Sequence, residues 1–196
     1  MTHRTKGAGR PVRSDKDKVY DSFLAASARL GDDRALARLA ERWQPRLLAH
    51  ARRLAGEREL AADITQQAWI EIIRGIAGLK DSDAFAAWAY RIVTRRCARA
   101  IGRRQRRRGG LAALAIENEA ITNESVHCEQ HTELAIIQSA MAELPPDQQA
   151  AMALFYLDGL RIAEIAVALD TAPGTIKTRL MHARNKLRAK LEGETP

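Results

Sequence analysis

The chain has 196 residues, 46% of them hydrophobic and 29% charged, so it can build a core in one compact domain or two small ones. Its formal net charge of +8 indicates a polyanionic partner, either nucleic acid or an acidic membrane surface. There is no apolar run of the ~18–20 residues that cross a bilayer and no apolar core of a signal peptide, and Cys97 and Cys128 give neither a disulfide framework nor zinc-finger spacing. We therefore expect a cytoplasmic protein.

Apolar residues recur with the period of helices through the first half of the chain, whereas no segment alternates with the period of strands. The spacing predicts helices over 33–54 and 58–76, a third that begins near 83, and a weaker one over 16–30. Gly56 is expected to end the helix over 33–54, and Ser82 or Asp83 can cap the third helix. The first half is therefore expected to form an all-helical domain.

The third helix changes character along its length. Its first part carries an apolar stripe with Phe85, Trp88 and Ile92, which favours packing of Trp88 in the core over a role as an aromatic platform for bases. From 95 to 116 the chain has eight arginines and no acidic residue. Gly109 and Gly110 are expected to end this helix, and its arginine-rich part is a candidate nucleic-acid surface.

A stretch with poor periodicity follows, and we interpret residues 109–131 as a flexible linker. Residues 117–133 carry five glutamates and no Lys or Arg. His127, Cys128 and His131 have the spacing of metal ligands on a helix, but a metal site needs three or four placed ligands, so chance is the favoured interpretation. We expect neither a metal nor another cofactor.

Helical periodicity returns over 132–143 and 147–158, with Leu144-Pro145-Pro146 between the two segments. Residues 161–188 then have the form of two short helices joined by a tight turn. The first helix carries a stripe at i, i+3, i+4 and i+7, formed by Ile162, Ile165, Ala166 and Leu169. Pro173-Gly174 is expected to interrupt the helical structure, and Thr175 is expected to be the N-cap of the second helix.

The second helix of this pair is strongly basic. Between 175 and 190 there are six Lys or Arg and no acidic residue. Its apolar stripe consists of Ile176, Leu180, Ala183 and Leu187. A helix held by its apolar side and presenting cations suits the major groove of DNA. The pattern alone is equally compatible with a basic face that contacts only solvent.

Several short motifs occur in a fixed order along the chain. In the first half they are Ala61-Ala62-Asp63-Ile64-Thr65-Gln66-Gln67-Ala68-Trp69 and Phe85-Ala86-Ala87-Trp88-Ala89-Tyr90-Arg91-Ile92. In the second half they are Leu144-Pro145, Ala163-Glu164-Ile165-Ala166, Gly174-Thr175-Ile176-Lys177-Thr178-Arg179-Leu180 and Ala183-Arg184. With this order the chain resembles the sigma-70 family of bacterial transcription initiation factors, most of all the short extracytoplasmic-function (ECF) group, which keeps regions 2 and 4.

The resemblance implies an all-α protein of two small helical domains. Region 2 would cover 16–108, and region 4 with its helix-turn-helix would cover 132–192. Residues 1–15 would form a basic tail, expected to be disordered, and 109–131 the flexible linker. Such a protein binds core RNA polymerase and directs it to promoters, with region 2 on the −10 element and region 4 on the −35 element. An anti-sigma factor is a further expected partner.

The resemblance also implies roles for individual residues. Docking on the coiled coil of the largest polymerase subunit would fall to Asp63, Gln66, Gln67 and Glu71, although these could equally form a solvated face. The polymerase flap would be a second contact. The −10 element would be contacted by Lys80, Arg91, Arg95, Arg96 and Arg99. The −35 element would be contacted by Thr175, Lys177, Thr178, Arg179, Met181, His182 and Arg184.

Two positions depart from the family pattern. Arg95 stands where asparagine is usual, which keeps a hydrogen-bond donor and adds charge. His182 stands where arginine is common, and a largely neutral histidine reads guanine less firmly than a bidentate arginine. The base preference at both positions is therefore left open.

Two other classes of protein compete with this interpretation. An autonomous helix-turn-helix regulator would act without being a polymerase subunit, but it commonly dimerises, and nothing in the sequence looks like a dimerisation module. An enzyme lacks support, because the chain has no Gly-rich phosphate loop and no nucleophile–base signature. Two weak DNA-binding modules joined by a linker gain affinity when polymerase holds them at a fixed separation. We therefore expect the free protein to bind promoter DNA poorly and the polymerase holoenzyme to bind it specifically.

Overall fold

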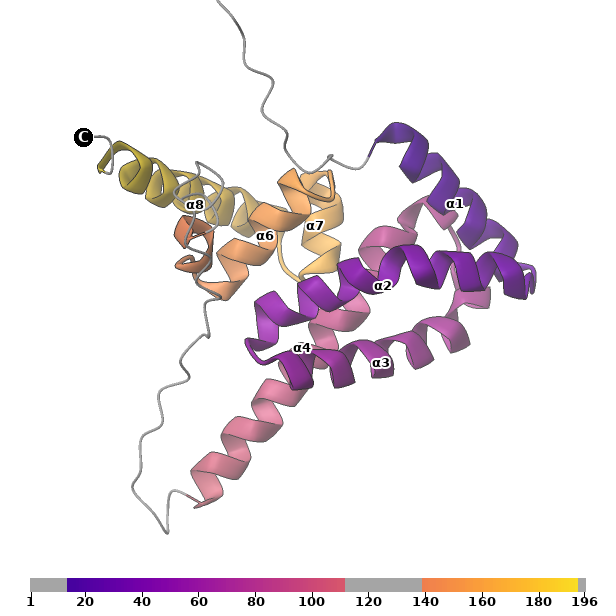
Figure 1. Ribbon diagram of the computed structural model, residues 1–196, viewed down its shortest axis with the longest axis horizontal. Helices are drawn as coiled ribbons and strands as arrows, with labels where there is room; N and C mark the ends of the chain where they lie inside the picture. The colour runs from indigo at the N-terminus through magenta and orange to yellow at the C-terminus, as the bar shows by residue number, and fades with distance from the viewer. Residues whose placement is uncertain (1–13, 112–138, 194–196) are drawn as a thin grey trace, which may run out of the picture.

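The computed structural model describes residues 14–111 and 139–193, and within these ranges the chain is helical with short connections (Figure 1). Most of the expected linker, the His127–Cys128–His131 cluster and nearly all of the expected basic tail lie outside the described residues. No described helix is long and apolar enough to span a membrane. Within the described ranges no three His, Cys, Asp or Glu side chains come together as metal ligands could.

Four helices form the first part of the molecule: α1 (Asp15–Arg29), α2 (Asp33–Ala55), α3 (Arg58–Gly75) and α4 (Phe85–Leu111). Two short 3-10 turns, η1 (Ile76–Gly78) and η2 (Ser82–Ala84), join α3 to α4. These bounds confirm the helices expected near 16–30, 33–54 and 58–76. α2 buries an apolar stripe with the helical spacing that predicted it, formed by Leu39, Trp43, Leu47 and Ala51.

Local signals explain several helix ends. Ser14 caps α1, because its hydroxyl accepts from the backbone N–H of Asp17 while the Asp17 carboxylate accepts from the N–H of Ser14. The Asp32 carboxylate caps α2 by accepting from two backbone N–H groups. Gly56 follows α2 with a φ of 77°, a left-handed conformation that favours glycine, and this confirms Gly56 as the helix stop.

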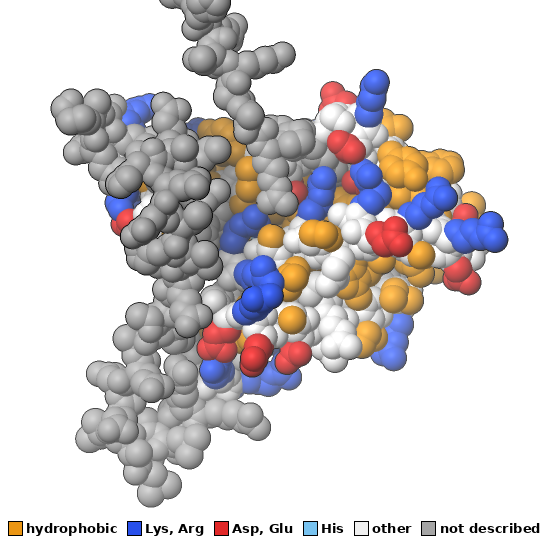
Figure 2. All heavy atoms as spheres, viewed as in Figure 1, with side chains coloured by type: hydrophobic (Ala, Val, Ile, Leu, Met, Phe, Trp, Pro, Cys, Tyr) orange, Lys and Arg blue, Asp and Glu red, His pale blue; other side chains and the backbone are white. Residues whose placement is uncertain are grey.

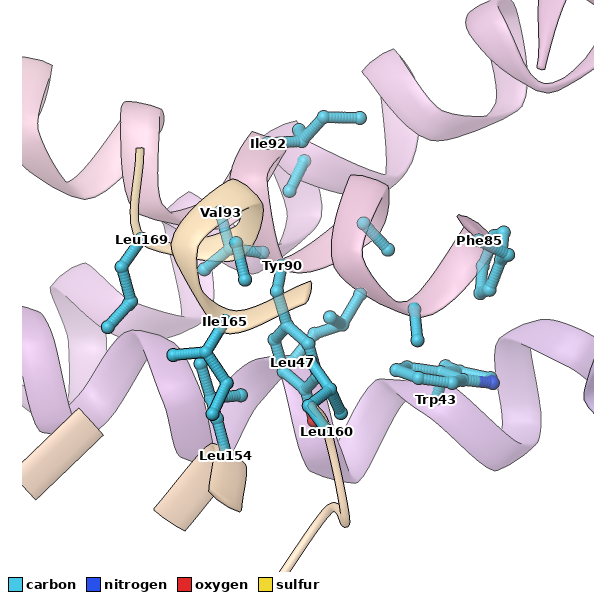
Figure 3. Packing of buried hydrophobic residues seen from close by; sticks show 14 of the residues in the cluster. Trp43, Leu47, Phe85, Tyr90, Ile92, Val93, Leu154, Leu160, Ile165 and Leu169 are labelled. Atoms are coloured by element: carbon cyan, nitrogen blue, oxygen red, sulfur yellow. The ribbon is translucent and has the colours of Figure 1, made fainter. Parts of the chain in front are cut away.

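Aromatic packing organises the core of these four helices. Trp43 is fully buried, and its ring meets Phe85 edge-on at 5.2 Å between centroids and Tyr90 at 5.6 Å (Figure 3). Trp88 is half-buried against this core, as its spacing predicts, and its ring lies 6.1 Å from that of Phe85. On the outer side of the bundle, α1 exposes the apolar side chains of Val19 and Phe23. Figure 2, drawn from the same side as Figure 1, shows hydrophobic side chains in orange at its upper right, where α1 lies.

The second part of the molecule comprises α6 (Pro146–Tyr156), α7 (Ile162–Ala168) and α8 (Pro173–Gly193), preceded by a helical turn over 139–142. Pro146 begins α6, one residue before the expected start at 147, because the first turn of a helix needs no N–H from it. α7 and α8 form the expected helix-turn-helix. Ile165 and Ile176 of its apolar stripes are fully enclosed, whereas Ile162 and Leu187 at the ends of the stripes are half-buried.

Three sequence-based expectations of helix ends are wrong. Thr175 is not the N-cap of α8, because the helix already begins at Pro173, whose fixed φ and missing N–H suit the first helical position. Neither Ser82 nor Asp83 caps α4; instead Asp81 caps η2 by accepting from the N–H of Asp83, and α4 follows directly. α4 also continues through the two glycines to Leu111.

The two parts pack against each other, which the sequence did not predict. α7 lies against α4, and α6 lies against α2 (Figure 1). Buried side chains from both parts, including Tyr90, Val93, Leu154, Leu160 and Ile165, form one continuous hydrophobic cluster (Figure 3). All-α architecture with both helical regions is confirmed.

Candidate nucleic-acid interface

The outer face of α8 is polar and accessible. Ile176, Leu180 and Ala183 anchor the helix, since each is at most 2% exposed. These anchors turn the opposite side of α8 to solvent, and every residue of that side with a predicted base or groove contact is exposed: Thr175, Lys177, Thr178, Met181 and His182. The arrangement matches what a recognition helix needs, namely donors and a short apolar contact on one accessible surface.

Arg179 and Arg184 contact other side chains of the same part of the molecule. Arg179 Nε lies 2.9 Å from a carboxylate oxygen of Asp147 at the start of α6. Arg184 Nε donates to the Tyr156 hydroxyl at 2.9 Å, and its guanidinium lies over the rings of Phe155 and Tyr156. Both arginines therefore brace α8 against α6.

Three of the predicted −10 arginines of α4 divide between two acidic partners. Arg91 lies 2.8 Å from Asp170, in the turn between α7 and α8, and Arg95 lies 3.5 Å from the same carboxylate. Arg96 pairs with Glu71 of α3 at 2.8 Å. Two further candidates for −10 contact, Arg99 and Lys80, are exposed.

Asp63, Gln66 and Gln67 share one exposed face of α3, as the predicted docking surface requires. Glu71 differs, because it is half-buried and paired with Arg96 of α4. The same face exposes Ile70 and Ile73, at 37% and 52%. These isoleucines were missed as site candidates, although Ile70 lies at i+3 from Gln67 and Ile73 at i+7 from Gln66, which places both on that surface.

Burial controls the ionisation of three groups in the core. It lowers the pKa of His50 to about 3, with help from the charge of Arg53. It raises the pKa of Cys97 to about 12, so this thiol is inert at neutral pH. Burial and then the charge of Asp158 raise the pKa of Tyr90 well above its usual value. None of the three has the accessibility of a catalytic group.

Two family models match the chain in the order of its two parts. "Sigma-70 region 2" matches residues 39–107, and "Sigma-70, region 4" matches residues 134–187.

Two curated relatives illustrate the sequence similarity. The ECF RNA polymerase sigma factor SigE of Mycolicibacterium smegmatis is 32% identical over 152 residues, which cover 74% of this chain but only 58% of that protein. The ECF RNA polymerase sigma-E factor of Escherichia coli K12 is 26% identical over 185 residues, which cover 90% of this chain and 96% of the relative.

Two solved structures share the fold. The sigma factor RpoE of Bartonella quintana, in complex with the anti-sigma factor NepR, has a TM-score of 0.64 at 23% identity and covers 82% of this chain and 98% of that chain. CnrH in complex with the cytosolic domain of CnrY has a TM-score of 0.58 at 22% identity and covers 90% and 99%.

Proposed function

This chain belongs to the ECF group of the sigma-70 family, and from that membership we propose that it binds core RNA polymerase and directs it to specific promoters. The observation that carries the proposal is the order of two matched regions, the second of which ends in a helix-turn-helix. Region 2 comprises α1–α4, and region 4 comprises α6–α8. For the domain limits we retain 16–108 and 132–192.

α8 is our proposed reader of the −35 element. The exposed side chains on the outer face of α8 supply base and groove contacts. Lys177 and His182 are hydrogen-bond donors, and Met181 is an apolar contact. Arg179 and Arg184 take the role of phosphate or packing contacts, because each already holds α8 to α6. Thr175 completes the set with a short hydroxyl donor, and Thr178, whose hydroxyl donates to the Gly174 carbonyl oxygen at 3.2 Å, adds an acceptor oxygen.

α4 and the loop before it are our proposed −10 surface. Lys80, Arg91, Arg95, Arg96 and Arg99 supply cations that follow a displaced strand. No catalytic step is needed, since promoter opening uses binding energy alone. Region 2 captures unpaired bases while region 4 holds the upstream duplex.

Asp63, Gln66, Gln67 and Glu71 form our proposed docking surface for the largest-subunit coiled coil, and region 4 would contact the polymerase flap. Once both regions are seated on polymerase, the second DNA contact becomes intramolecular, and affinity rises without new contacts. Core polymerase is cytoplasmic, so we place the action of this chain there. One solved neighbour, the sigma factor RpoE of Bartonella quintana, is a complex with the anti-sigma factor NepR, which supports an anti-sigma factor as a further partner.

The test is capture of core polymerase by the full chain, followed by run-off transcription and mapping of start sites. Asp63→Arg reverses a charge on the exposed α3 face and should reduce capture at least tenfold. Glu41→Arg reverses an exposed charge on α2 and is the matched control. Tight, sequence-specific promoter binding by the free chain, without stimulation of polymerase, would instead identify an autonomous regulator.

A further inference from the structure

α1 carries apolar side chains on two opposite faces. The inner face is buried against the rest of region 2 and consists of Leu24, Ala25 and Ala28. On the outer face Val19 is 71% exposed and Phe23 62%, and Leu30, which caps the end of the helix, is 91% exposed. A helix with apolar residues all round is normally buried, so we expect the outer face of α1 to have a partner.

The outer residues have the spacing of a contact between two helices. Val19, Phe23, Ala26 and Leu30 follow one another at steps of four, three and four residues, and we call them the α1 outer stripe. Such steps are those of the a and d positions of a coiled coil, where side chains of one helix fit between those of another. The stripe therefore suits another helix, over a short contact.

The stripe is accessible and of limited size. Figure 1 shows α1 at the outer edge of region 2, on the opposite side of the molecule from α8. The exposed parts of its side chains amount to on the order of 400 Å², about half of what one partner contributes to an interface of standard size. A partner helix would therefore be held in a weak, reversible complex.

A second copy of the chain fits the stripe when the two α1 helices run antiparallel. Phe23 of each copy would then lie opposite the small side chain of Ala26 of the other, and Val19 would lie opposite Leu30. Large and small side chains would alternate across the contact, as the close packing of two helices requires. The contact would be isologous, because each copy offers the same residues on either side of a two-fold axis.

Charges at the two ends of the stripe are complementary in this arrangement. Asp15 and Lys16 precede the stripe, Asp33 and Arg34 follow it, and all four are exposed. Antiparallel pairing would bring Lys16 of one copy to Asp33 of the other, and Asp15 to Arg34. Parallel pairing would instead bring each charge to its own equivalent, which is repulsive.

We propose that the chain forms a weak homodimer through the α1 outer stripes of two antiparallel copies. Because α1 and α8 lie on opposite sides of each copy, the two α8 helices point away from the contact (Figure 1). The dimer therefore does not pair its recognition helices on adjacent half-sites, as dimeric helix-turn-helix regulators do. The inference depends on α1 and does not rest on the proposed function.

Sedimentation equilibrium of the full chain, at about 5–500 µM, tests the proposal, and we expect a dissociation constant on the order of 100 µM. Phe23→Glu places a charge in the middle of the stripe and should raise this constant at least about tenfold. Ile73→Glu is the matched control, because it makes the same kind of change on α3 at a position that is 52% exposed. It should change the constant by less than about twofold, and since both side chains are exposed, both variants should keep the wild-type circular dichroism.

A charge exchange tests the antiparallel arrangement. Lys16→Glu and Asp33→Lys each place like charges opposite one another, and because the pair occurs twice in the dimer, each should weaken it about three- to tenfold. The double variant restores opposite charges and should recover the wild-type dissociation constant to within about twofold.

The outcomes are distinct. A chain that stays monomeric over the whole range would overturn the proposal and assign the stripe to a helix of another protein. Equal weakening by Phe23→Glu and Ile73→Glu would remove the contact from α1. Loss of the dimer in Phe23→Glu without recovery in the double charge variant would keep the stripe as the contact and refute the antiparallel arrangement.

Discussion

His50 should make this protein sensitive to mild acid. Its side chain is fully buried between α2 and α4, where Nε2 lies 3.0 Å from the Thr94 hydroxyl and the ring packs against Tyr90 at 4.9 Å between centroids. Burial and the neighbouring charge of Arg53 lower the pKa of His50 from 6.5 to about 3. The native state therefore keeps His50 neutral at pH values where the unfolded chain takes up a proton.

The size of the effect follows from linkage. The folded pKa of His50 lies below the unfolded value, so its contribution to stability is present above pH 6.5 and is lost as the pH falls from 6.5 towards 3. Each pH unit in this window lowers the free energy of unfolding by about 1.4 kcal/mol. Between pH 7 and pH 5 the loss is about 2 kcal/mol, a large fraction of the ~5–15 kcal/mol typical of a domain.

Urea denaturation at pH 7 and pH 5, at constant ionic strength and followed by far-UV circular dichroism, measures this loss. His50→Phe keeps a ring against Tyr90 and cannot titrate, so its free energy of unfolding should change by less than about 0.5 kcal/mol between the two pH values. His182→Gln, at an exposed position, should keep the wild-type difference. An equal loss in wild type and His50→Phe would refute the assignment to His50.

Three further predictions follow from burial, capping and charge. Leu154→Ala, at a fully buried position, should lower the free energy of unfolding by about 2–5 kcal/mol in urea, whereas Leu157→Ala, 43% exposed, should change it by less than about 0.5 kcal/mol; equal effects would contradict the packing. Ser14→Ala removes the hydroxyl that accepts from the Asp17 N–H and should lower stability by about 0.5–2 kcal/mol in calorimetry, while Ser14→Asp should restore most of it. Lys177→Ala should weaken holoenzyme binding to −35 DNA by about 1–3 kcal/mol and relax the base preference at the position it contacts, and an equal loss of affinity for every −35 sequence variant would place Lys177 on a phosphate instead.

Helix positions were predictable because burial imposes a period on the sequence. α2 is the clearest case, since its buried residues follow the 3.6-residue spacing and its end carries Gly56. Helix starts were less predictable, because several residues near a boundary can cap equally well. At α8 the Pro173-Gly174 pair was interpreted as a break, although proline at the first helical position is also a start.

Burial of α4 on more than one side was not predictable from its own sequence. Trp88 and Tyr90 lie two residues apart and cannot share one helix face, yet Trp88 packs against the core and Tyr90 is fully buried. Tyr90 packs on Trp43 and His50 of α2, and the Trp88 ring lies beside Gly75 of α3. A further covering surface comes from α7, more than 60 residues later in the chain. Periodicity within one helix carries no information about a partner so distant in sequence.

Charge is the property that the sequence describes least well, because a count of cations says nothing about their partners. The sequence makes α4 and α8 look like two continuous basic surfaces. In the structure Arg91, Arg95 and Arg96 contact acidic side chains, and so does Arg179 of α8. Each of these arginines must leave its acidic partner before it contacts a phosphate. We therefore expect fewer counterions to be released from DNA than the number of Lys and Arg side chains suggests. The internal pairing of these arginines is therefore a second reason, besides the weakness of each DNA-binding module alone, to expect weak DNA binding by the free chain.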